Sequence, residues 1–372
     1  MINTHVTSEQ KIDLKSLSRT QLEQLCSEMG LPAYRGKQIF QWLYQKRASS
    51  FSEMTNLSKD LREELEKRFV ITTITEASRQ TSRDGTTKFL FRLHDDKLIE
   101  AVLIPDLYDD GAANRLTVCV SSQVGCVFGC RFCATGKMGF FRNLIAGEIV
   151  DQLQAINDLA LERYGKKITN IVYMGMGEPL HNYNAVINSA HIVCDELSLD
   201  MSPRRITIST VGLAKQIRQF AVEKQPFKLA LSLHAPSDTK RNEIMPINES
   251  MDLNDLREAL TFYYQSVNQP VTYEYLLFDR FNDNKEDAEA LAKIANWIPS
   301  KVNIIMYNNV ADVDLKRVKE KRLDKFMKHL TEKGVRATVR RSRGDDIDAG
   351  CGQLAIREGE PRGKTIAKSV SN

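Results

Sequence analysis

From Leu116 onward, short apolar runs alternate with longer segments of helical periodicity. Apolar runs of about four to eight residues are typical of buried strands, and apolar residues three and four positions apart indicate helices. Six such pairs follow one another, with strands predicted at 117–121, 168–174, 205–209, 229–233, 272–277 and 302–305, and helices at 145–164, 185–197, 213–223, 253–266, 284–296 and 318–333. Repeated strand–helix units form parallel sheets, and six are too few for a closed eight-unit barrel. The sequence therefore predicts an α/β fold with an open, partial barrel.

The remaining segments differ in character from the barrel. Residues 14–70 carry apolar side chains at helical spacing, with Ser58 as a predicted helix start. Asp84-Gly85 lies between runs rich in Thr, Phe and Leu, which indicates a β-hairpin. The segment after Pro361 is polar and is expected to be loose. The predicted domains are a helical accessory domain (1–70), a hairpin linker (71–115), the partial barrel (116–345) and a C-terminal loop with tail (346–372).

Hydropathy and charge exclude few classes of protein. No run of about 18 apolar residues occurs, so no membrane span is predicted. Residues 1–15 are polar and lack a signal-peptide core, which favours the cytoplasm. The net charge of +4 does not by itself indicate nucleic acid. Two basic stretches are either solvated faces or phosphate contacts, namely Arg35, Lys37, Lys46 and Arg47, and Lys333, Arg336, Arg340, Arg341 and Arg343.

Three of the seven cysteines lie within eight residues, directly after the first predicted strand. Cys126, Cys130 and Cys133 have the spacing C-x3-C-x2-C, and thiolates are soft ligands suited to iron–sulfur clusters or zinc. Most clusters take four cysteines, so three leave one iron open to a substrate or cofactor. Structural zinc is the alternative. It needs a fourth ligand, for which Cys119 and Cys351 are candidates, and it usually comes with two C-x2-C pairs, of which one is present.

A three-cysteine loop after the first strand of a partial barrel resembles the radical S-adenosylmethionine (SAM) enzymes. Longer stretches resemble one family of these enzymes, the RlmN/Cfr adenine methyltransferases, and within it the RlmN type. The resemblance runs in order from about residue 20 to 356. It rests on the stretches Cys119–Cys126, Gly139–Leu144, Met174–Pro179, Ser232–His234 and Arg343–Leu354.

The resemblance implies the cofactors and the residues that hold them. One 4Fe-4S cluster would be bound by Cys126, Cys130 and Cys133, and its open iron would bind SAM, of which two molecules are used per turnover. The Gly-rich loop at Met174–Pro179 follows the second strand, where backbone can approach a ligand closely. The implied SAM contacts are Gly177, Glu178, Ser209, Ser232, Leu233, His234 and Asn308. Without the resemblance, Ser209 and Asn308 would be interpreted as strand-end caps.

The resemblance also implies a catalytic cycle on two further cysteines. Cys351 lies in a Gly-rich loop, which leaves its thiol accessible, and would carry the methyl group as S-methylcysteine. The resulting methylene radical would add to adenine C2, and Glu100 would remove the C2 proton. Cys119 would then attack Cys351 to form a transient disulfide and free the product. The aspartates before Cys351 favour a raised thiol pKa, so activation of this thiol must come from elsewhere. Cys26 and Cys194 lie in helical apolar patterns and are predicted as core thiols.

The implied substrates are 23S rRNA, at the peptidyl-transferase centre, and the anticodon loop of certain tRNAs. An external electron donor such as flavodoxin is implied, and we expect a monomer. The helical domain is expected to hold RNA backbone through its basic residues, with Trp42 either in the core or stacked on a base. The target adenine must be flipped out of its stack to be reached.

Three other functions remain as alternatives. The Cfr type methylates adenine C8 by the same chemistry; it tends to carry a cysteine where Val124 stands and alanine where Pro179 stands, and it differs before Asp346. A radical SAM activase would not require Cys119 or Cys351, and a zinc-bound RNA-binding module would not catalyse.

Two positions depart from the family pattern. Gly350 replaces a frequent alanine, which is expected only to loosen the loop. The prolines that often flank the position of Asn308 are absent, which puts its contact with SAM in question.

Overall fold

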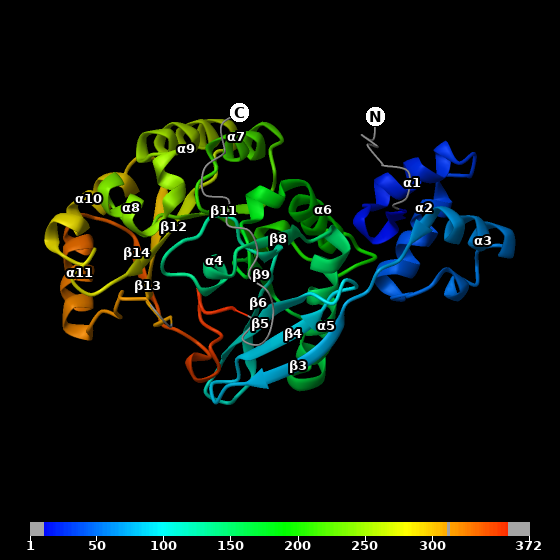
Figure 1. The fold of residues 1–372 in the computed structure, drawn as a ribbon, viewed down its shortest axis with the longest axis horizontal. Helices are drawn as coiled ribbons and strands as arrows, with labels where there is room; N and C mark the ends of the chain where they lie inside the picture. The colour runs from blue at the N-terminus through cyan, green and yellow to red at the C-terminus, as the bar shows by residue number, and fades with distance from the viewer. Residues whose placement is uncertain (1–10, 311–312, 356–372) are drawn as a thin grey trace.

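The computed structural model describes residues 11–310 and 313–355. Within them, one ten-stranded sheet forms the centre of the molecule (Figure 1). Every neighbouring pair from β6 to β14 is parallel, so the carboxyl ends of these strands share one edge of the sheet. Across the sheet, the order is β14 (Ala337–Arg340), β13 (Ser300–Met306), β12 (Val271–Leu277), β11 (Lys228–Ser232), β10 (Ile206–Thr210), β9 (Asn170–Tyr173), β6 (Ala113–Cys119), β5 (Leu98–Leu107), β4 (Thr87–Arg92) and β3 (Thr75–Thr81).

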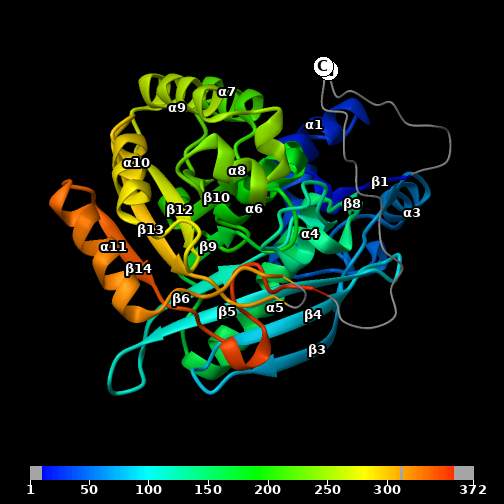
Figure 2. The same ribbon diagram turned by 60° about the vertical axis from the view of Figure 1, so that its left-hand side comes forward.

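Helices cover the outer face of the parallel strands (Figures 1 and 2). They are α5 (Ala146–Tyr164), α6 (Tyr183–Cys194), α7 (Ala214–Val222), α9 (Leu253–Val267), α10 (Lys285–Ala295) and α11 (Glu320–Glu332). The short helix α8 (Asp238–Ile244) lies instead at the carboxyl edge of the sheet, where its Arg241 donates to the carbonyls of Val211 and Leu233. Side chains at their ends fix several boundaries. The Asp252 carboxylate accepts hydrogen bonds from two backbone N–H groups at the start of α9, and Asn268 ends that helix in the left-handed conformation.

The predicted α/β partial barrel is confirmed. Each of the six predicted strands overlaps one parallel strand between β6 and β13. A seventh parallel strand, β14, was not predicted, because its four residues lie inside the second basic stretch and lack an apolar run. No helix in the described part of the chain is long and apolar enough to cross a membrane. The predicted loose tail after Pro361 lies outside the described residues.

Residues 75–107 extend the barrel sheet by three antiparallel strands. β3 pairs with β4, β4 with β5, and β5 with β6 of the barrel. The hairpin predicted at Asp84-Gly85 is present between β3 and β4. Gly85 has φ +85°, and the Asp84 carboxylate accepts a hydrogen bond of 2.9 Å from the Thr86 N–H. The segment that the sequence marked as a linker is thus continuous with the barrel sheet.

A small helical region lies beside α5 and α6, away from α10 and α11 (Figure 1). It contains β1 (Ile12–Asp13), α1 (Arg19–Glu28), α2 (Tyr34–Phe40), α3 (Lys59–Arg68) and β2 (Phe69–Val70). Lys15 forms an ion pair with Asp151 of α5 in which both side chains are buried. Arg47, from the first basic stretch, pairs with Asp158 of the same helix. Part of the positive charge predicted to face RNA therefore contacts the barrel.

Candidate active site

The three clustered cysteines line one cavity at the carboxyl edge of the parallel sheet. The loop that carries them lies between β7 (Gln123–Gly125) and α4 (Ala134–Met138), and β7 pairs with β8 (Phe140–Asn143). Gly125 has φ +75°, and a Cβ atom there would lie 1.8 Å from the carbonyl oxygen of Gly139. Only glycine fits this close approach, after which the Cys126 N–H donates to the same carbonyl at 2.9 Å. The start of the loop is therefore held by a backbone contact with Gly139, the residue before β8.

Burial disfavours the charged form of these three thiols, so they ionise only when cations such as metal ions bind beside them. Burial raises the pKa of Cys126 to about 12, and burial together with the neighbouring thiols raises the pKa of Cys130 and Cys133. In the described ranges, no three His, Cys, Asp or Glu side chains converge as ligands of a single metal ion. Zinc needs its sulfur ligands at about 2.3 Å from one point, whereas an iron–sulfur cluster offers each thiolate a different iron. Three thiols that line one cavity are soft ligands, which suit either metal.

Loops after β9, β10 and β11 form the opposite wall of this first cavity. Gly177 has φ +99°, and a Cβ atom there would lie 2.5 Å from Cβ of Gln123. Next to it, the Glu178 carboxylate accepts hydrogen bonds from the N–H groups of Leu180 at 3.0 Å and Val211 at 2.9 Å. Burial nevertheless raises the pKa of Glu178 to about 7. This carboxyl therefore connects two loops and can take up a proton or face a cation in the cavity.

Three further predicted SAM contacts lie on this wall, and two predicted contacts do not. Ser209, Ser232 and His234 line the cavity, and the two serine hydroxyls are 3.4 Å apart. Burial lowers the pKa of His234 to about 3. Its Nδ1 accepts the Leu276 N–H at 3.1 Å, so the neutral ring carries its proton on Nε2. Leu233 is fully buried beside the cavity, and Asn308 lines a second cavity instead.

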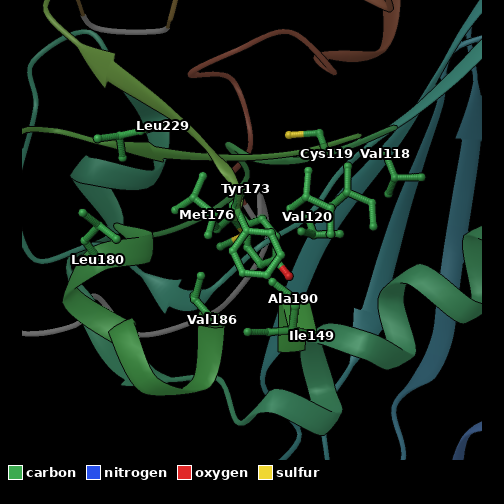
Figure 3. Close-up of a cluster of buried hydrophobic side chains, with 14 of the residues drawn as sticks. Val118, Cys119, Val120, Ile149, Tyr173, Met176, Leu180, Val186, Ala190 and Leu229 are labelled. Carbon is green, nitrogen blue, oxygen red and sulfur yellow. The ribbon is translucent and has the colours of Figure 1, made fainter. Parts of the chain in front are cut away.

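The second cavity contains Cys119 and Cys351, which are 232 positions apart in the sequence. Cys119 extends to the side of its strand opposite Val118 and Val120, away from the hydrophobic cluster around Tyr173 (Figure 3). Cys351 also lines the first cavity, so its thiol is placed between the three clustered cysteines and Cys119. Arg340 faces both thiols and lowers the pKa of Cys351, which burial raises. The pKa of Cys351 is raised on balance, and this guanidinium partly offsets the effect of burial.

The loop that carries Cys351 lies against the β3–β4 hairpin and the cluster loop (Figure 2). The Asp84 carboxylate accepts the Gly344 N–H at 3.0 Å, and the Ser82 hydroxyl donates to Asp346. At the other end, the Ala134 N–H donates to the Gly352 carbonyl at 2.7 Å, and the Thr135 hydroxyl donates to the Leu354 carbonyl at 2.5 Å. The two cysteine loops thus hold each other.

Gly350 has a more specific effect than the loosening expected from the sequence. A Cβ atom at this position would lie 1.9 Å from Nδ2 of Asn308. Asn308 also accepts a hydrogen bond of 2.5 Å from the Ser342 hydroxyl. The absence of a side chain at Gly350 therefore gives Asn308 its place in the second cavity.

Glu100 lines a third cavity, which it shares with residues 346–348 of the same loop. Its side chain is 6% exposed and its Oε1 lies 3.2 Å from Nζ of Lys88. Burial raises the pKa of Glu100, and Lys88 partly offsets this effect. Glu100 and Cys351 thus line different cavities, on either side of the loop.

Comparison with known proteins identifies the family. Two family models match: the ribosomal RNA large subunit methyltransferase N-terminal domain over residues 12–71, and the radical SAM superfamily over residues 120–295. A Salinibacter ruber protein named "Probable dual-specificity RNA methyltransferase RlmN" is 48% identical, across 95% of this chain and 96% of the relative. A Cytophaga hutchinsonii protein of the same name is 47% identical, across 96% of both chains. This chain belongs to the RlmN family of radical SAM enzymes.

The crystal structure of a related protein has the same fold as this chain. The crystal structure of a radical SAM methyltransferase from Sphaerobacter thermophilus has a TM-score of 0.82 and 42% identity, covering 92% of this chain and 99% of that one. Membership in the radical SAM superfamily brings an iron–sulfur cluster and SAM. The three thiols of the first cavity are suited to the cluster, and the polar groups opposite them are suited to SAM.

Sequence reasoning missed two buried charged residues of the RlmN family site. Arg241 is fully buried, donates to the carbonyls of Leu233 and Val211, and partly offsets the rise in the pKa of Cys130 that burial causes. Glu274 lines the first cavity, where its Oε1 accepts a hydrogen bond of 2.9 Å from Asn303. Its signal in the sequence was a single carboxylate inside an otherwise uncharged strand, β12, which is buried at every position. No comparable signal marks Arg241.

Proposed function

We propose that this chain transfers a methyl group from SAM to C2 of adenosine in RNA, with Cys351 as the methyl carrier. The observation that carries the proposal is the place of Cys351, which lines both the cavity of the three clustered thiols and the cavity of Cys119. A radical SAM activase has no use for this pair of thiols. The names of the relatives support RNA as the substrate class.

Each residue then has a distinct task. When bound at Cys126, Cys130 and Cys133, one 4Fe-4S cluster with two SAM molecules per turnover supplies the methyl group and the radical that activates it. The Cys351 thiolate, stabilised by Arg340, accepts the methyl group and joins its carbon to C2 of adenine. Glu100 accepts the C2 proton. The Cys119 thiolate attacks Sγ of Cys351, which frees the methylated base and forms a disulfide that an external reductant must reopen.

The finer substrate assignment is part of the same proposal. We propose 23S rRNA and tRNA as substrates, because the relatives are named dual-specificity enzymes. Arg341 and Arg343 line the cavity of Cys119 and Cys351, and we propose that they contact phosphates of the RNA. Since Glu100 and Cys351 line different cavities, we infer that the loop at 346–350 shifts when adenine enters. An external electron donor such as flavodoxin, a monomeric state and a cytoplasmic location complete the proposal.

The competing product is C8-methyladenosine, made by Cfr-type enzymes. Val124 and Pro179 favour the C2 product, as the sequence comparison above indicates. The test is mass spectrometry of 23S rRNA and tRNA from a strain that lacks the gene, with and without the gene restored. Restoration of 2-methyladenosine in both RNAs supports the proposal, whereas 8-methyladenosine, or no change in methylation, contradicts it.

A further inference from the structure

Lys88 and Glu100 form an ion pair that is largely shielded from water. Lys88 lies on β4 and Glu100 on the adjacent β5, with Nζ and Oε1 3.2 Å apart. The two side chains are 14% and 6% exposed. Nζ of Lys88 also lies 3.5 Å from the carbonyl oxygen of Asp348, in the loop that carries Cys351. Lys88 therefore contacts both the base assigned above and the loop with the methyl carrier.

The second oxygen of Glu100 is left for a ligand. Oε2 is buried and has no hydrogen-bond partner among the described residues, although the Ala355 backbone N–H lies near the carboxylate and stabilises its charged form. A buried carboxylate oxygen without a donor costs free energy, so Oε2 is available to accept a proton from a ligand that enters the cavity. The cavity that Glu100 lines also contains Arg79 of β3, Lys88 of β4, and Asp346 and Asp348 of the loop.

The charges around Glu100 oppose one another. Burial raises the pKa of Glu100, Asp348 raises it further, and Lys88 and the backbone N–H of Ala355 lower it. An opposite charge within about 4–6 Å lowers the pKa of a carboxyl by about 1–3 units. Lys88 is the only cation among these contributors, so the ionised form of Glu100 depends mainly on this lysine.

Resting on the proposed function, we propose that Lys88 is a positioning residue for proton removal from adenine C2. It holds Oε1 of Glu100, so that Oε2 faces the cavity as an ionised acceptor. In the step that it supports, the C2–H bond of the adduct breaks, its electron pair stays on the adduct, and the proton goes to Oε2. Lys88 keeps its own proton throughout.

The first measurement is independent of catalysis. Infrared difference spectra between each holoenzyme and its Glu100→Gln counterpart isolate the carboxyl band of Glu100, which is followed against pH. We expect Lys88→Met to raise the pH at which Glu100 is half-ionised by at least about one unit, and Lys88→Arg to leave it near the wild-type value.

Lys88→Gln, which keeps a hydrogen-bond donor without the charge, is expected to behave like Lys88→Met. Lys97→Met is the matched control, because this lysine, in the turn between β4 and β5, contacts the ring of Phe141 instead. An unchanged midpoint in both Lys88→Met and Lys88→Gln overturns the proposal.

The second measurement uses RNA with deuterium at C2 of the target adenine. In Lys88→Met, the isotope effect on product formation should grow as the pH falls, and rates should recover partly at high pH. A uniform rate loss at every pH would indicate a merely structural lysine and overturn the inference.

The two assignments, Glu100 as base and Lys88 as positioning residue, fail separately. If Glu100→Gln methylates C2 normally, the base assignment is wrong. If Glu100→Gln is inactive but Lys88→Met shows normal pH behaviour, only the assignment of Lys88 is rejected.

Discussion

The two loops that carry the reactive cysteines are built in opposite ways. The cluster loop places three thiols within eight residues, between a two-stranded ribbon and a short helix, and its glycine turn is local. The Cys351 loop is held mainly by distant partners, namely the β3–β4 hairpin, Asn308 and the cluster loop. A metal-binding loop needs fixed spacing, whereas a loop that carries the methyl group, as proposed for Cys351, must meet two different cavities. The difference indicates that cluster binding and methyl transfer can be separated by mutation.

The largest effect is expected from cysteines of the cluster loop. Cys130→Ser should lose the cluster and all methyl transfer, because a hydroxyl is a poor ligand for iron. Cys351→Ala should also abolish methyl transfer but keep the iron. Iron and sulfide analysis of anaerobically purified protein, with Cys194→Ser as control, checks both. Iron loss in Cys351→Ala would contradict the division between the loops.

The next effect concerns the second thiol of the carrier cavity. Cys119→Ala should accumulate a covalent protein–RNA adduct, because no thiolate remains to attack Cys351. Denaturing gel electrophoresis after incubation with RNA and SAM detects the adduct. Cys26→Ala, in the helical region, is the control and should turn over normally. Normal turnover by Cys119→Ala would show that its assigned role is wrong.

A smaller effect is expected where the hairpin holds the Cys351 loop. Asp84→Ala removes the acceptor of the Gly344 N–H and should lower the methylation rate about tenfold, equivalent to about 1.4 kcal/mol, with the iron content unchanged. Asp110→Ala is the matched control, because Asp110 accepts the Ala112 N–H in a turn of the same sheet that does not face the loop. Equal rates for the two variants would refute the anchoring role of the hairpin.

The smallest effect is expected where the two loops meet. Thr135→Val removes the hydroxyl that donates to the Leu354 carbonyl, a bond worth about 1 kcal/mol. We expect a methylation rate about fivefold lower. Thr261→Val, whose hydroxyl bonds to the Arg257 carbonyl within α9, is the control. A loss of iron in Thr135→Val would show that the loops are not independent in cluster binding.

Much of the barrel could be predicted because its pattern is local. Six apolar runs and the cysteine spacing need no knowledge of distant residues, and Asp84-Gly85 marks its own turn. The same reasoning missed β14, because a short strand at the sheet edge with basic residues gives no apolar run. The contact of Asn308 with SAM, which the resemblance implied, stays a prediction, and the structure shows that this residue lines the cavity of Cys119.

The sequence by itself determined the parallel α/β architecture, the three-thiol loop and the resemblance that names the family. Only the tertiary structure decided which thiols share a cavity, that Arg340 faces both Cys119 and Cys351, and that Lys88 holds Glu100. The physical reason is the distance along the chain over which each effect acts. Periodicity and ligand spacing act over a few residues along the chain, whereas the charge and burial that set the pKa of a thiol or carboxyl come from segments brought together only by folding.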